Sequence, residues 1–308
     1  GFSEWNKNSL QPLFLFENKL LKVLSDQYSL DSVKRVEKIF SKPPNIDTYI
    51  RNSVRKENYF EKFKGSSVST SHFRFSKNVS LIETKGYRSG EWWVQSLAAS
   101  LPVKIAPMDF KGKYVLDVCC APGGKSFQLA DQGAILTSID KSEKRLKLMK
   151  ENLDRLKYDL ELICTDVLQY KPKKLFDIIL LDPPCTATGT LGKNPDLQFL
   201  NPLDKLEELL DTQKKMLDLC SGWLKDNGFI IYSVCSLQKE EGENQINLFL
   251  AKHDKFRAVK PKGGPHLYKD GFEIGKDRGI RIMPFFEERI GGTEGFYFAY
   301  LQLKGKNN

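Results

Sequence analysis

The stretch DVCCAPGGKSF, residues 117–127, comes at the end of the apolar run YVLDV (114–118) and decides how the chain is understood. Glycines beside a lysine, directly after a strand, are typical of loops that bind nucleotides. Gly124-Lys125-Ser126 matches the second half of the phosphate-binding pattern G-x-x-x-x-G-K-[ST], but Cys119 stands where its first glycine belongs. The stretch therefore predicts a site for a nucleoside triphosphate or for another adenosine-bearing molecule.

Apolar runs alternate with helix-like segments on the C-terminal side of this loop. Five runs have strand character, at 114–118, 134–140, 160–166, 176–182 and 229–236. Helices are expected from about Lys125, over 142–156, and along an amphipathic stretch from Leu206 to a stop at Asn227-Gly228. Two late strands are expected near 279–285 and 295–303. This alternation predicts an α/β fold with a parallel sheet covered on both faces.

The carboxyl ends of the five expected strands carry the residues of chemical interest. Beside the glycine loop they are Asp140, Asp166, the run Asp182-Pro183-Pro184-Cys185, and Cys235. In an open parallel sheet these ends lie along one edge, and ligands bind outside that edge. We therefore expect these residues to line one site.

Two features favour a nucleoside without a phosphate chain. Pro122 lacks the amide hydrogen that a phosphate nest would use. Asp140 lies 17 residues after the first glycine of the pair, near the spacing of about 20 at which an acid binds ribose hydroxyls. S-adenosylmethionine fits, with its amino-acid part at loop amides and Lys125, its ribose at Asp140 and its adenine near Asp166. Asp140 could instead cap the next helix, a role for which Ser142 competes.

Cys185 and Cys235 both follow expected strands and should face the same edge. Carbon 5 of cytosine is a poor nucleophile, but a thiolate that adds to carbon 6 makes an enamine-like ring that accepts a methyl group at carbon 5. One cysteine would attack, the other would assist release, and Asp182 would bind the ring at N3 and at its exocyclic amine. A buried structural role is the ordinary alternative for each cysteine. A Cys–His hydrolase is disfavoured, because no His lies at a strand end.

The N-terminal part of the chain has a different pattern. Residues 1–40 are expected to be helical, and the Pro-rich stretch 41–45 interrupts the pattern. Residues 41–90 are expected to form a small α+β subdomain, with strands or a helix over 47–54, 55–63 and 72–83. Residues 91–308 would form the large domain, which begins with Trp92, Trp93, Val94 and Leu97 as the lead-in to a helix. The apolar face of the first segment would include Leu13, Leu20, Val23 and Leu24.

The small subdomain is rich in basic residues. Between Lys38 and Arg88 the chain has 11 Lys or Arg against 4 Asp or Glu. Basic residues interleaved with aromatics suit RNA backbones and unstacked bases, whereas the ordinary alternative is a solvated basic face over an apolar core. The aromatic residues of this stretch are Tyr49, Tyr59, Phe60, Phe63, Phe73, Phe75 and Tyr87.

Composition sets further bounds. The net charge is +9, and 40% of the residues are hydrophobic. No apolar run approaches the roughly 18–20 residues that a membrane helix needs, and no signal peptide is evident, although the chain starts with Gly. The six cysteines are expected to be reduced thiols in a cytoplasmic protein. With no C-x-x-C pair and three histidines, no metal site is expected.

Taken together, these motifs resemble the RNA 5-methylcytosine methyltransferases of the RsmB/Nop2/Sun family, and the bacterial RsmB-like members in particular. The resemblance covers about residues 86–303 and rests on DVCCAPGGKS, SIDKSEKRL, CTDV, LLDPPCTATGTLGKNPD, YSVCSL and GGTEGFYFAYL. It implies a Rossmann-like class I methyltransferase domain, a small RNA-recognition-like subdomain before it, and residues 1–40 as a possible remnant of a larger helical domain.

The same resemblance implies residue roles. Cys235 would be the nucleophile and Cys185 the releasing residue, with S-adenosylmethionine as cofactor and ribosomal RNA of the small subunit as substrate. Contacts to the cofactor or target base would come from Cys119, Cys120, Ala121, Pro122, Gly123, Gly124, Lys125, Asp140, Arg145, Asp166 and Asp182. The chain departs from the family pattern at Cys120, Val234, Ser96 and Glu294, none of which is a reacting thiol.

Other functions remain open at this point. The thiols could have exchanged roles, with Cys185 attacking. The substrate could be a transfer RNA, or the chain could be a non-catalytic RNA-binding factor in ribosome assembly, although both thiols, Asp182 and Lys125 argue against that. An amino-methyltransferase is disfavoured, because Cys185 stands where an aromatic residue would stack the base. Protein partners are not indicated.

Overall fold

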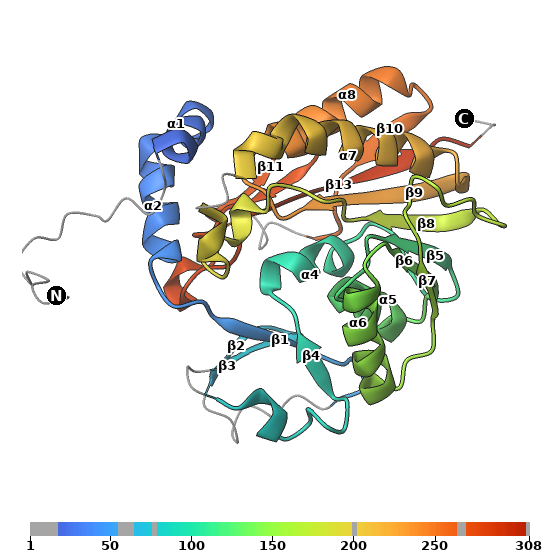
Figure 1. The fold of residues 1–308 in the computed structure, drawn as a ribbon, viewed down its shortest axis with the longest axis horizontal. Coiled ribbons are helices and arrows are strands. Elements are labelled where there is room, and N and C mark those ends of the chain that lie inside the picture. Colours follow the sequence, from blue (N-terminus) through green and yellow to red (C-terminus); the bar gives the residue numbers. More distant parts are fainter. Residues whose placement is uncertain (1–17, 55–64, 76–78, 199–201, 264–268, 306–308) are drawn as a thin grey trace, which may run out of the picture.

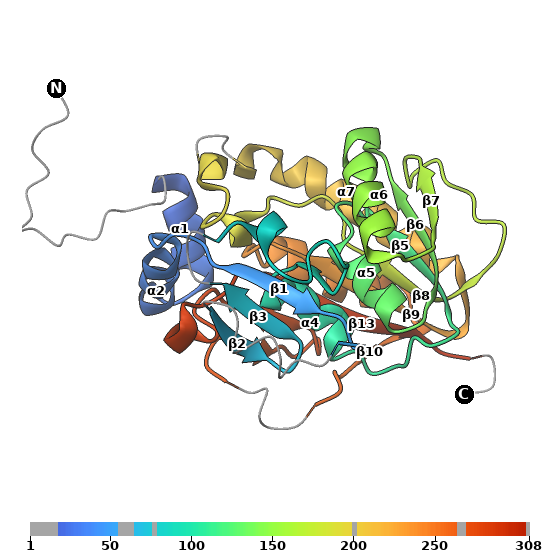
Figure 2. The same ribbon diagram turned by 90° about the horizontal axis from the view of Figure 1, so that it is seen from below.

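The computed structural model describes residues 18–54, 65–75, 79–198, 202–263 and 269–305. They form a pair of N-terminal helices, a small antiparallel sheet and a large mixed sheet flanked by helices (Figures 1 and 2). Within these residues, no helix is both long enough and apolar enough to cross a bilayer.

The N-terminal helices are α1 (Asn18–Gln27) and α2 (Leu30–Phe40). Ser29 caps α2, because its side chain accepts a hydrogen bond from the amide of Ser32. The expected apolar residues Leu20 and Leu24 are buried, whereas Leu13 lies outside the described residues. Both helices pack in one apolar cluster with residues of the large domain, namely Leu191, Leu237, Met283 and Phe285.

The small sheet has the order β2-β3-β1-β4, and all its pairs are antiparallel. Its strands are β2 (Gly65–Ser69), β3 (His72–Phe75), β1 (Ile46–Ile50) and β4 (Trp92–Val94). The segment leads into a helix, as expected, but Trp92–Val94 themselves form a strand that pairs with Thr48–Ile50 of β1. The sheet thus continues past residue 90, and helix α4 (Leu97–Lys104) follows it. The segment expected over 55–63 lies outside the described residues.

The aromatic residues of the basic stretch contribute to the protein core. Tyr49, Phe73 and Phe75 are buried, and Tyr49 stacks on Trp93 with ring centroids 4.7 Å apart. Arg74 is also buried and forms an ion pair with Asp47. The expectation that aromatic residues of this stretch stack on RNA bases is therefore wrong for Tyr49, Phe73 and Phe75. These three residues instead belong to an apolar core, which was the alternative. Tyr59, Phe60 and Phe63 lie outside the described residues.

The large sheet has the order β11-β12-β13-β9-β8-β5-β6-β7, and β10 also pairs with β13. The five strands from β9 to β7 are parallel to one another, and β13 runs antiparallel to β9. The predicted α/β class with a parallel core is therefore confirmed. The strands are β5 (Tyr114–Val118), β6 (Ile135–Asp140), β7 (Glu161–Cys164), β8 (Phe176–Leu181), β9 (Leu224–Val234), β10 (Phe256–Val259), β11 (Phe272–Ile274), β12 (Ile280–Ile282) and β13 (Phe296–Leu303).

Helices cover both faces of this sheet (Figure 2). On one face α4 and α5 (Gly124–Asp131) pack on strand residues that include Val115 and Ile178, and α6 (Glu143–Leu156) lies beside them. On the other face α7 (Leu206–Ser221) and α8 (Gln245–Lys252) pack on the alternate residues Leu116 and Ile179. Successive strand residues point to opposite faces, which explains why these strands are apolar throughout.

One predicted helix end is wrong. Helix α7 ends at Ser221, and β9 already begins at Leu224, so Asn227 and Gly228 lie within the strand. Asn227 has a positive φ of 63°, and the register of β9 with β8 shifts at this point. An Asn-Gly pair is typical of the end of a helix, but in this protein it forms an irregularity within a strand. Both residues readily adopt the left-handed backbone conformation, which helix ends and strand irregularities both use.

Candidate active site

A cavity of about 530 Å³ lies along the carboxyl ends of the parallel strands. The topology brings together most of the predicted site residues, as expected for one edge of a parallel sheet. The predicted residues that line it are Cys119, Ala121, Pro122, Asp140, Arg145, Asp166, Asp182, Cys185 and Cys235. Of the other predicted residues, Cys120, Gly123, Gly124 and Lys125 do not line it.

The loop after β5 has few amides left for a phosphate chain. The amide of Cys120 donates to the carbonyl of Ile139, and the amide of Gly123 donates to the carbonyl of Cys120. The amide of Ala121 donates to Asp140 Oδ2 at 3.1 Å, and Pro122 has no amide hydrogen. These amides therefore organise the loop itself, and the triphosphate alternative is disfavoured.

Asp140 fixes this loop to the next helix. Its Oδ2 also accepts from Arg145 Nη2 at 2.6 Å, and its Oδ1 accepts from the amide of Ser142 at 2.9 Å. The cap of α6 is Ser142, whose hydroxyl oxygen accepts from the amide of Arg145. Asp140 therefore does not cap the helix, and its carboxylate borders the cavity from a rigid position. Asp166 also lines the cavity, and its Oδ1 accepts from the amide of Leu168.

Cys120 belongs to the core rather than to the cavity. It is buried, and its Sγ lies 3.7 Å from Met149 Sδ. The neighbouring Cys119 has a positive φ of 62° and borders the cavity. Burial raises the pKa of the Cys119 thiol to about 12, and the nearby carboxylates of Asp140 and Asp182 act in the same direction. The Cys119 thiol is therefore uncharged and forms part of the cavity lining.

Lys125 reaches across the sheet edge from α5. Its Nζ donates to Asp182 Oδ2 at 2.7 Å, and it lies 4.9 Å from the centroid of the Phe296 ring. Burial lowers the pKa of Lys125, but the charge and hydrogen bond of Asp182 outweigh it, so the pKa is raised overall. The Lys125 ammonium and the Asp182 carboxylate therefore form an ion pair at the end of β8.

The two cysteine thiols converge beside this ion pair. Cys185 Sγ and Cys235 Sγ are 3.5 Å apart, although the residues are 50 positions apart in the sequence. The hydrogen bond with Cys235, followed by burial, raises the pKa of Cys185 well above its ordinary value. Cys185 is therefore expected to stay protonated.

Backbone contacts hold the loops that carry the thiols. The amide of Gly189 donates to the carbonyl of Cys235 at 3.0 Å, and the amide of Gly295 donates to the carbonyl of Gly189 at 2.8 Å. A Cβ atom added to Gly189 would lie 2.0 Å from the carbonyl oxygen of Gly295. Glycine is required at position 189 because the two backbones touch.

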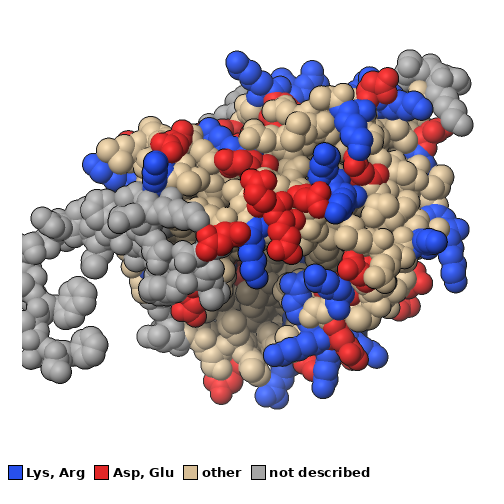
Figure 3. All heavy atoms as spheres, turned by 45° about the horizontal axis from the view of Figure 1, so that its top comes forward, with Lys and Arg blue, Asp and Glu red and all other residues tan. Residues whose placement is uncertain are grey.

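Among the described residues, no three His, Cys, Asp or Glu side chains are arranged to hold a metal ion. Lys, Arg, Asp and Glu are interspersed around a hollow on the face of the molecule seen in Figure 3.

Comparison with known proteins places the chain in a family. The family model described as 16S rRNA methyltransferase RsmB/F matches residues 105–302, which is more than half of the chain. The chain belongs to the RsmB/F family. This is a family of S-adenosylmethionine-dependent methyltransferases, so the predicted family and cofactor class are confirmed.

Curated RsmB relatives are similar over most of this chain. Ribosomal RNA small subunit methyltransferase B of Pseudomonas syringae pv. tomato is 33% identical over 276 residues, which cover 84% of this chain and 59% of that protein. The Vibrio cholerae protein of the same name is 30% identical over 295 residues, which cover 92% of this chain and 64% of that protein. The chain thus spans about three fifths of the length of these relatives.

Solved structures of low sequence identity share the RsmB/F-type fold. A methyltransferase homologue from Pyrococcus horikoshii is 23% identical and has a TM-score of 0.77, with 94% of this chain and 96% of that chain covered. NSun6 from Pyrococcus horikoshii, solved with the S-adenosylmethionine analogue SFG, is 18% identical and has a TM-score of 0.79. Its alignment covers 94% of this chain and 98% of that chain.

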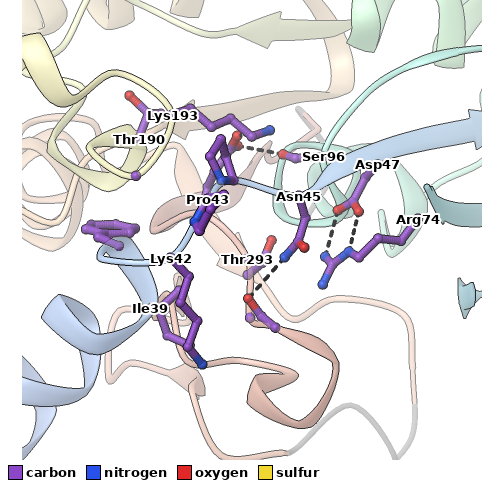
Figure 4. Close-up of a pocket in the computed structure, with 16 residues that line it drawn as sticks. Ile39, Lys42, Pro43, Asn45, Asp47, Arg74, Ser96, Thr190, Lys193 and Thr293 are labelled. Atoms are coloured by element: carbon purple, nitrogen blue, oxygen red, sulfur yellow. Dashed lines mark hydrogen bonds and ion pairs between the residues drawn. The ribbon is translucent and has the colours of Figure 1, made fainter. Parts of the chain in front are cut away.

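Ser96 and Glu294, two positions at which the resemblance implied a departure from the family pattern, contact each other. Ser96 Oγ donates to Glu294 Oε2 at 2.6 Å, and Lys193 forms an ion pair with the same carboxylate. These residues line a small cavity where the N-terminal segment, the loop after Cys185 and the loop before β13 meet (Figure 4). The hydroxyl at position 96 and the carboxylate at position 294 are therefore complementary.

Two residues that organise the site were missed by sequence reasoning. Asp117, within β5, is buried and accepts a hydrogen bond from the Ser126 hydroxyl. Glu241, in a π-helical turn over Glu240–Asn244, is buried between the thiol loops. An acid inside an apolar strand was a visible signal for Asp117. Glu241 lies in an acidic stretch, where its burial is not evident from the sequence.

Proposed function

We propose that this chain transfers a methyl group from S-adenosylmethionine to carbon 5 of a cytosine in small-subunit ribosomal RNA. The observation that carries the proposal is the 3.5 Å separation of Cys185 Sγ and Cys235 Sγ beside the Lys125–Asp182 ion pair. A structural role for the two thiols would not require this position at the cavity that the family's cofactor would occupy. The names of the RsmB relatives support ribosomal RNA as the substrate.

The cavity fits the cofactor in size and in its polar groups. Its volume of about 530 Å³ falls in the range of roughly 300–1,000 Å³ that is usual for small-molecule sites. Asp140 would bind the ribose, Asp166 would lie near the adenine, and backbone groups around Cys119 would meet the amino-acid part. When bound, S-adenosylmethionine supplies the methyl group.

The thiols provide the covalent chemistry. Cys235 Sγ, as thiolate, forms a bond to carbon 6, and the displaced ring electrons make carbon 5 nucleophilic. After carbon 5 has been methylated, a base removes its proton, the bond between Cys235 Sγ and carbon 6 breaks, and the ring double bond returns. Cys185 stays protonated and donates its S–H hydrogen bond to Cys235 Sγ, which stabilises Cys235 as the leaving thiolate. The raised pKa of Cys185, caused first by its hydrogen bond with Cys235, supports this division of roles.

The Lys125–Asp182 pair compensates the charge that develops on the ring. Addition at carbon 6 moves electrons toward N3, which then needs a hydrogen-bond or proton donor. Asp182 was expected to bind both N3 and the exocyclic amine, and its contact with Lys125 leaves the carboxylate as the acceptor for the exocyclic amine. Lys125 brings the donor, and its raised pKa keeps it charged.

The test uses Cys235→Ala and Cys185→Ala, with Cys164→Ala as a matched control at an exposed thiol outside the cavity. On small-subunit RNA with S-adenosylmethionine, Cys235→Ala should form no covalent adduct, and Cys185→Ala should accumulate one on a denaturing gel. Mass spectrometry of digested RNA should identify 5-methylcytidine with the wild type and Cys164→Ala only. The reverse adduct pattern would assign the attack to Cys185.

A second measurement separates the remaining alternatives. The same methyl-transfer assay with transfer RNA in place of ribosomal RNA tests the tRNA alternative. RNA binding by the wild type without any methyl transfer to either RNA would favour a non-catalytic assembly factor and would contradict the proposal.

A further inference from the structure

The loops after β8 and β9 are joined by three hydroxyl groups, which we call the hydroxyl cluster: Thr186, Thr188 and Ser236. Thr186 Oγ1 and Ser236 Oγ are 3.0 Å apart, and Thr188 Oγ1 and Ser236 Oγ are 3.2 Å apart. All three residues are buried. Each of Thr186 and Ser236 directly follows one of the two thiols in the sequence. The cluster therefore links the backbone of Cys185 to that of Cys235.

Glu241 binds this cluster from the π-helical turn. Its Oε1 accepts from the amide of Thr186 at 2.9 Å, and its Oε2 accepts from Thr186 Oγ1 at 2.5 Å. A third donor is Gln213 Nε2, at 3.0 Å from Oε1. Glu241 has no exposed surface, and none of these donors is a charged group.

The elements around Glu241 hold it in place. The Tyr232 hydroxyl donates to the backbone carbonyl of Glu241 at 2.7 Å. Gln213 Nε2 also donates to the carbonyl of Pro184, directly before Cys185, at 3.0 Å. Arg281 donates to the carbonyl of Ser236. Both thiol loops are therefore fixed by side chains from β9, α7 and β12 that converge on Glu241 and Ser236.

A buried carboxylate without a cationic partner is costly, because burial removes the hydration of the charge. The three donors satisfy both oxygens of Glu241. π-Helical turns of this kind occur frequently at functional sites. This carboxylate binds Thr186, the residue directly after Cys185, so it can fix the position of the Cys185 loop.

We propose that Glu241 is a positioning residue, which holds Thr186 and the hydroxyl cluster so that Cys185 and Cys235 remain close enough to cooperate on one base. Its place in catalysis rests on the proposed cytosine-5 methylation. The geometric part does not, because it concerns the distance between two sulfur atoms.

Disulfide formation by a chemical oxidant measures this distance in solution. Diamide takes up two hydrogen atoms, both S–H bonds are lost, and one S–S bond of about 2.05 Å forms, which needs only a small approach from 3.5 Å. Wild-type protein in low diamide should form the Cys185–Cys235 disulfide, quantified by thiol counting and peptide mass spectrometry. The Cys235→Ala variant identifies the signal, because it cannot form this bond.

Glu241→Ala should form the disulfide about tenfold more slowly, since it removes three buried hydrogen bonds. The charge of Glu241 contributes to the raised pKa of Cys185, so losing it would favour thiolate and speed oxidation. A slower rate is therefore a geometric effect. Glu241→Gln should stay within about threefold of wild type, because the Thr186 hydroxyl can turn and accept from the amide. Glu240→Gln, on the same turn but in contact with Gln27, should match wild type.

If Glu241→Ala fails to fold, Thr186→Val tests the contact between Glu241 and Thr186 from the other side. This substitution removes the Thr186 hydroxyl and preserves the shape of the side chain. It should slow oxidation, and Thr186→Ser should restore the rate. A wild-type disulfide rate in folded Glu241→Ala, or in Thr186→Val where the former does not fold, would overturn the proposal. Folding is checked by circular dichroism and thermal unfolding.

Methyl transfer provides the second readout. The rate constant kcat should fall in Glu241→Ala while the KM for RNA stays unchanged, and Glu241→Gln should recover most of it. If the wild type transfers no methyl group, the proposed function fails, yet the disulfide rates still decide the geometric role. If transfer occurs and Glu241→Ala keeps full kcat, the positioning role fails alone.

Discussion

The two sides of the cavity are built in different ways. The loop side consists of Cys119, Ala121, Pro122, Asp140 and Arg145, which come from one strand–loop–helix–strand unit and the start of the next helix. The thiol side consists of Asp182, Cys185 and Cys235, which follow the ends of β8 and β9, and Lys125 of α5 contacts it through Asp182. Short-range contacts to Asp140 hold the first side, whereas a buried polar network centred on Glu241 holds the second.

This difference indicates where each side is vulnerable. On the loop side, the partners of Asp140 lie within twenty residues of it, so local folding sets the geometry. On the thiol side, Glu241 contacts residues 55 and 28 positions away, so the geometry depends on the assembled domain. A substitution on one side should therefore leave the other side intact, and the following variants examine that separation.

The largest effect is expected for Lys125→Met. The change leaves Asp182 without its cation and removes the donor for the ring, and losing one such electrostatic group lowers kcat by about 100- to 1,000-fold. The affinity for S-adenosylhomocysteine, measured by calorimetry, should change little. Lys147→Met, at an exposed lysine on α6, is the control. A wild-type kcat in Lys125→Met would show that the Lys125–Asp182 ion pair has no role in the reaction.

Asp140→Ala should act on the loop side. Loss of the three hydrogen bonds to Asp140 should weaken S-adenosylhomocysteine binding by about 10- to 100-fold. The rate of the Cys185–Cys235 disulfide in diamide should stay at the wild-type value. Slower formation of the disulfide would show that a change on the loop side alters the thiol side, which contradicts the expectation that the two sides are independent.

Asp117 lies in β5 directly before the loop side, and its effect should depend on pH. Burial raises its pKa from 3.8 to about 7, against the hydrogen bond from Ser126. The folded state therefore binds more protons than the unfolded state between these values, and stability falls as pH rises from about 4 to about 7. Asp117→Asn should flatten this decline, on the order of a few kcal/mol, in urea unfolding at pH 5 to 8. An unchanged slope would contradict the buried neutral carboxyl.

The smallest effect is expected for the contact between Ser96 and Glu294, which lies outside both sides of the cavity. Ser96→Asp keeps a side chain that can cap α4 but sets a second carboxylate against Glu294, and we expect a loss of about 1 kcal/mol in unfolding free energy. Adding Glu294→Gln should restore it. Thermal unfolding of the single and double variants measures the difference, and an additive result would show that the two residues do not interact.

The loop side was largely predictable from the sequence. An apolar strand, a glycine loop and an acid at the next strand end are local patterns, and the parallel topology then places Asp140, Asp182 and both thiols at one edge. Position in the sequence also suggested Gly124 and Cys120 as lining residues, but Cys120 packs on Met149 in the core. The hydrophobic periodicity of a sequence does not show whether a side chain in a tight loop points to the cavity or to the core.

The thiol side and the small sheet were less predictable, because long-range contacts decide them. Trp92–Val94 form a strand because β1 offers an edge to pair with, a partner more than forty positions away. Likewise, the burial of Glu241 depends on Thr186 and Gln213. In both cases the local sequence is compatible with other structures, and tertiary pairing selects one.

The contact between Gly189 and Gly295 limits which substitutions this protein can accept. The amide of Gly189 donates to the carbonyl of Cys235, and the amide of Gly295 donates to the carbonyl of Gly189, so an alanine at position 189 would push apart the loops that carry the two sulfur atoms. The spacing of the two sulfur atoms therefore depends on a residue that has no side chain.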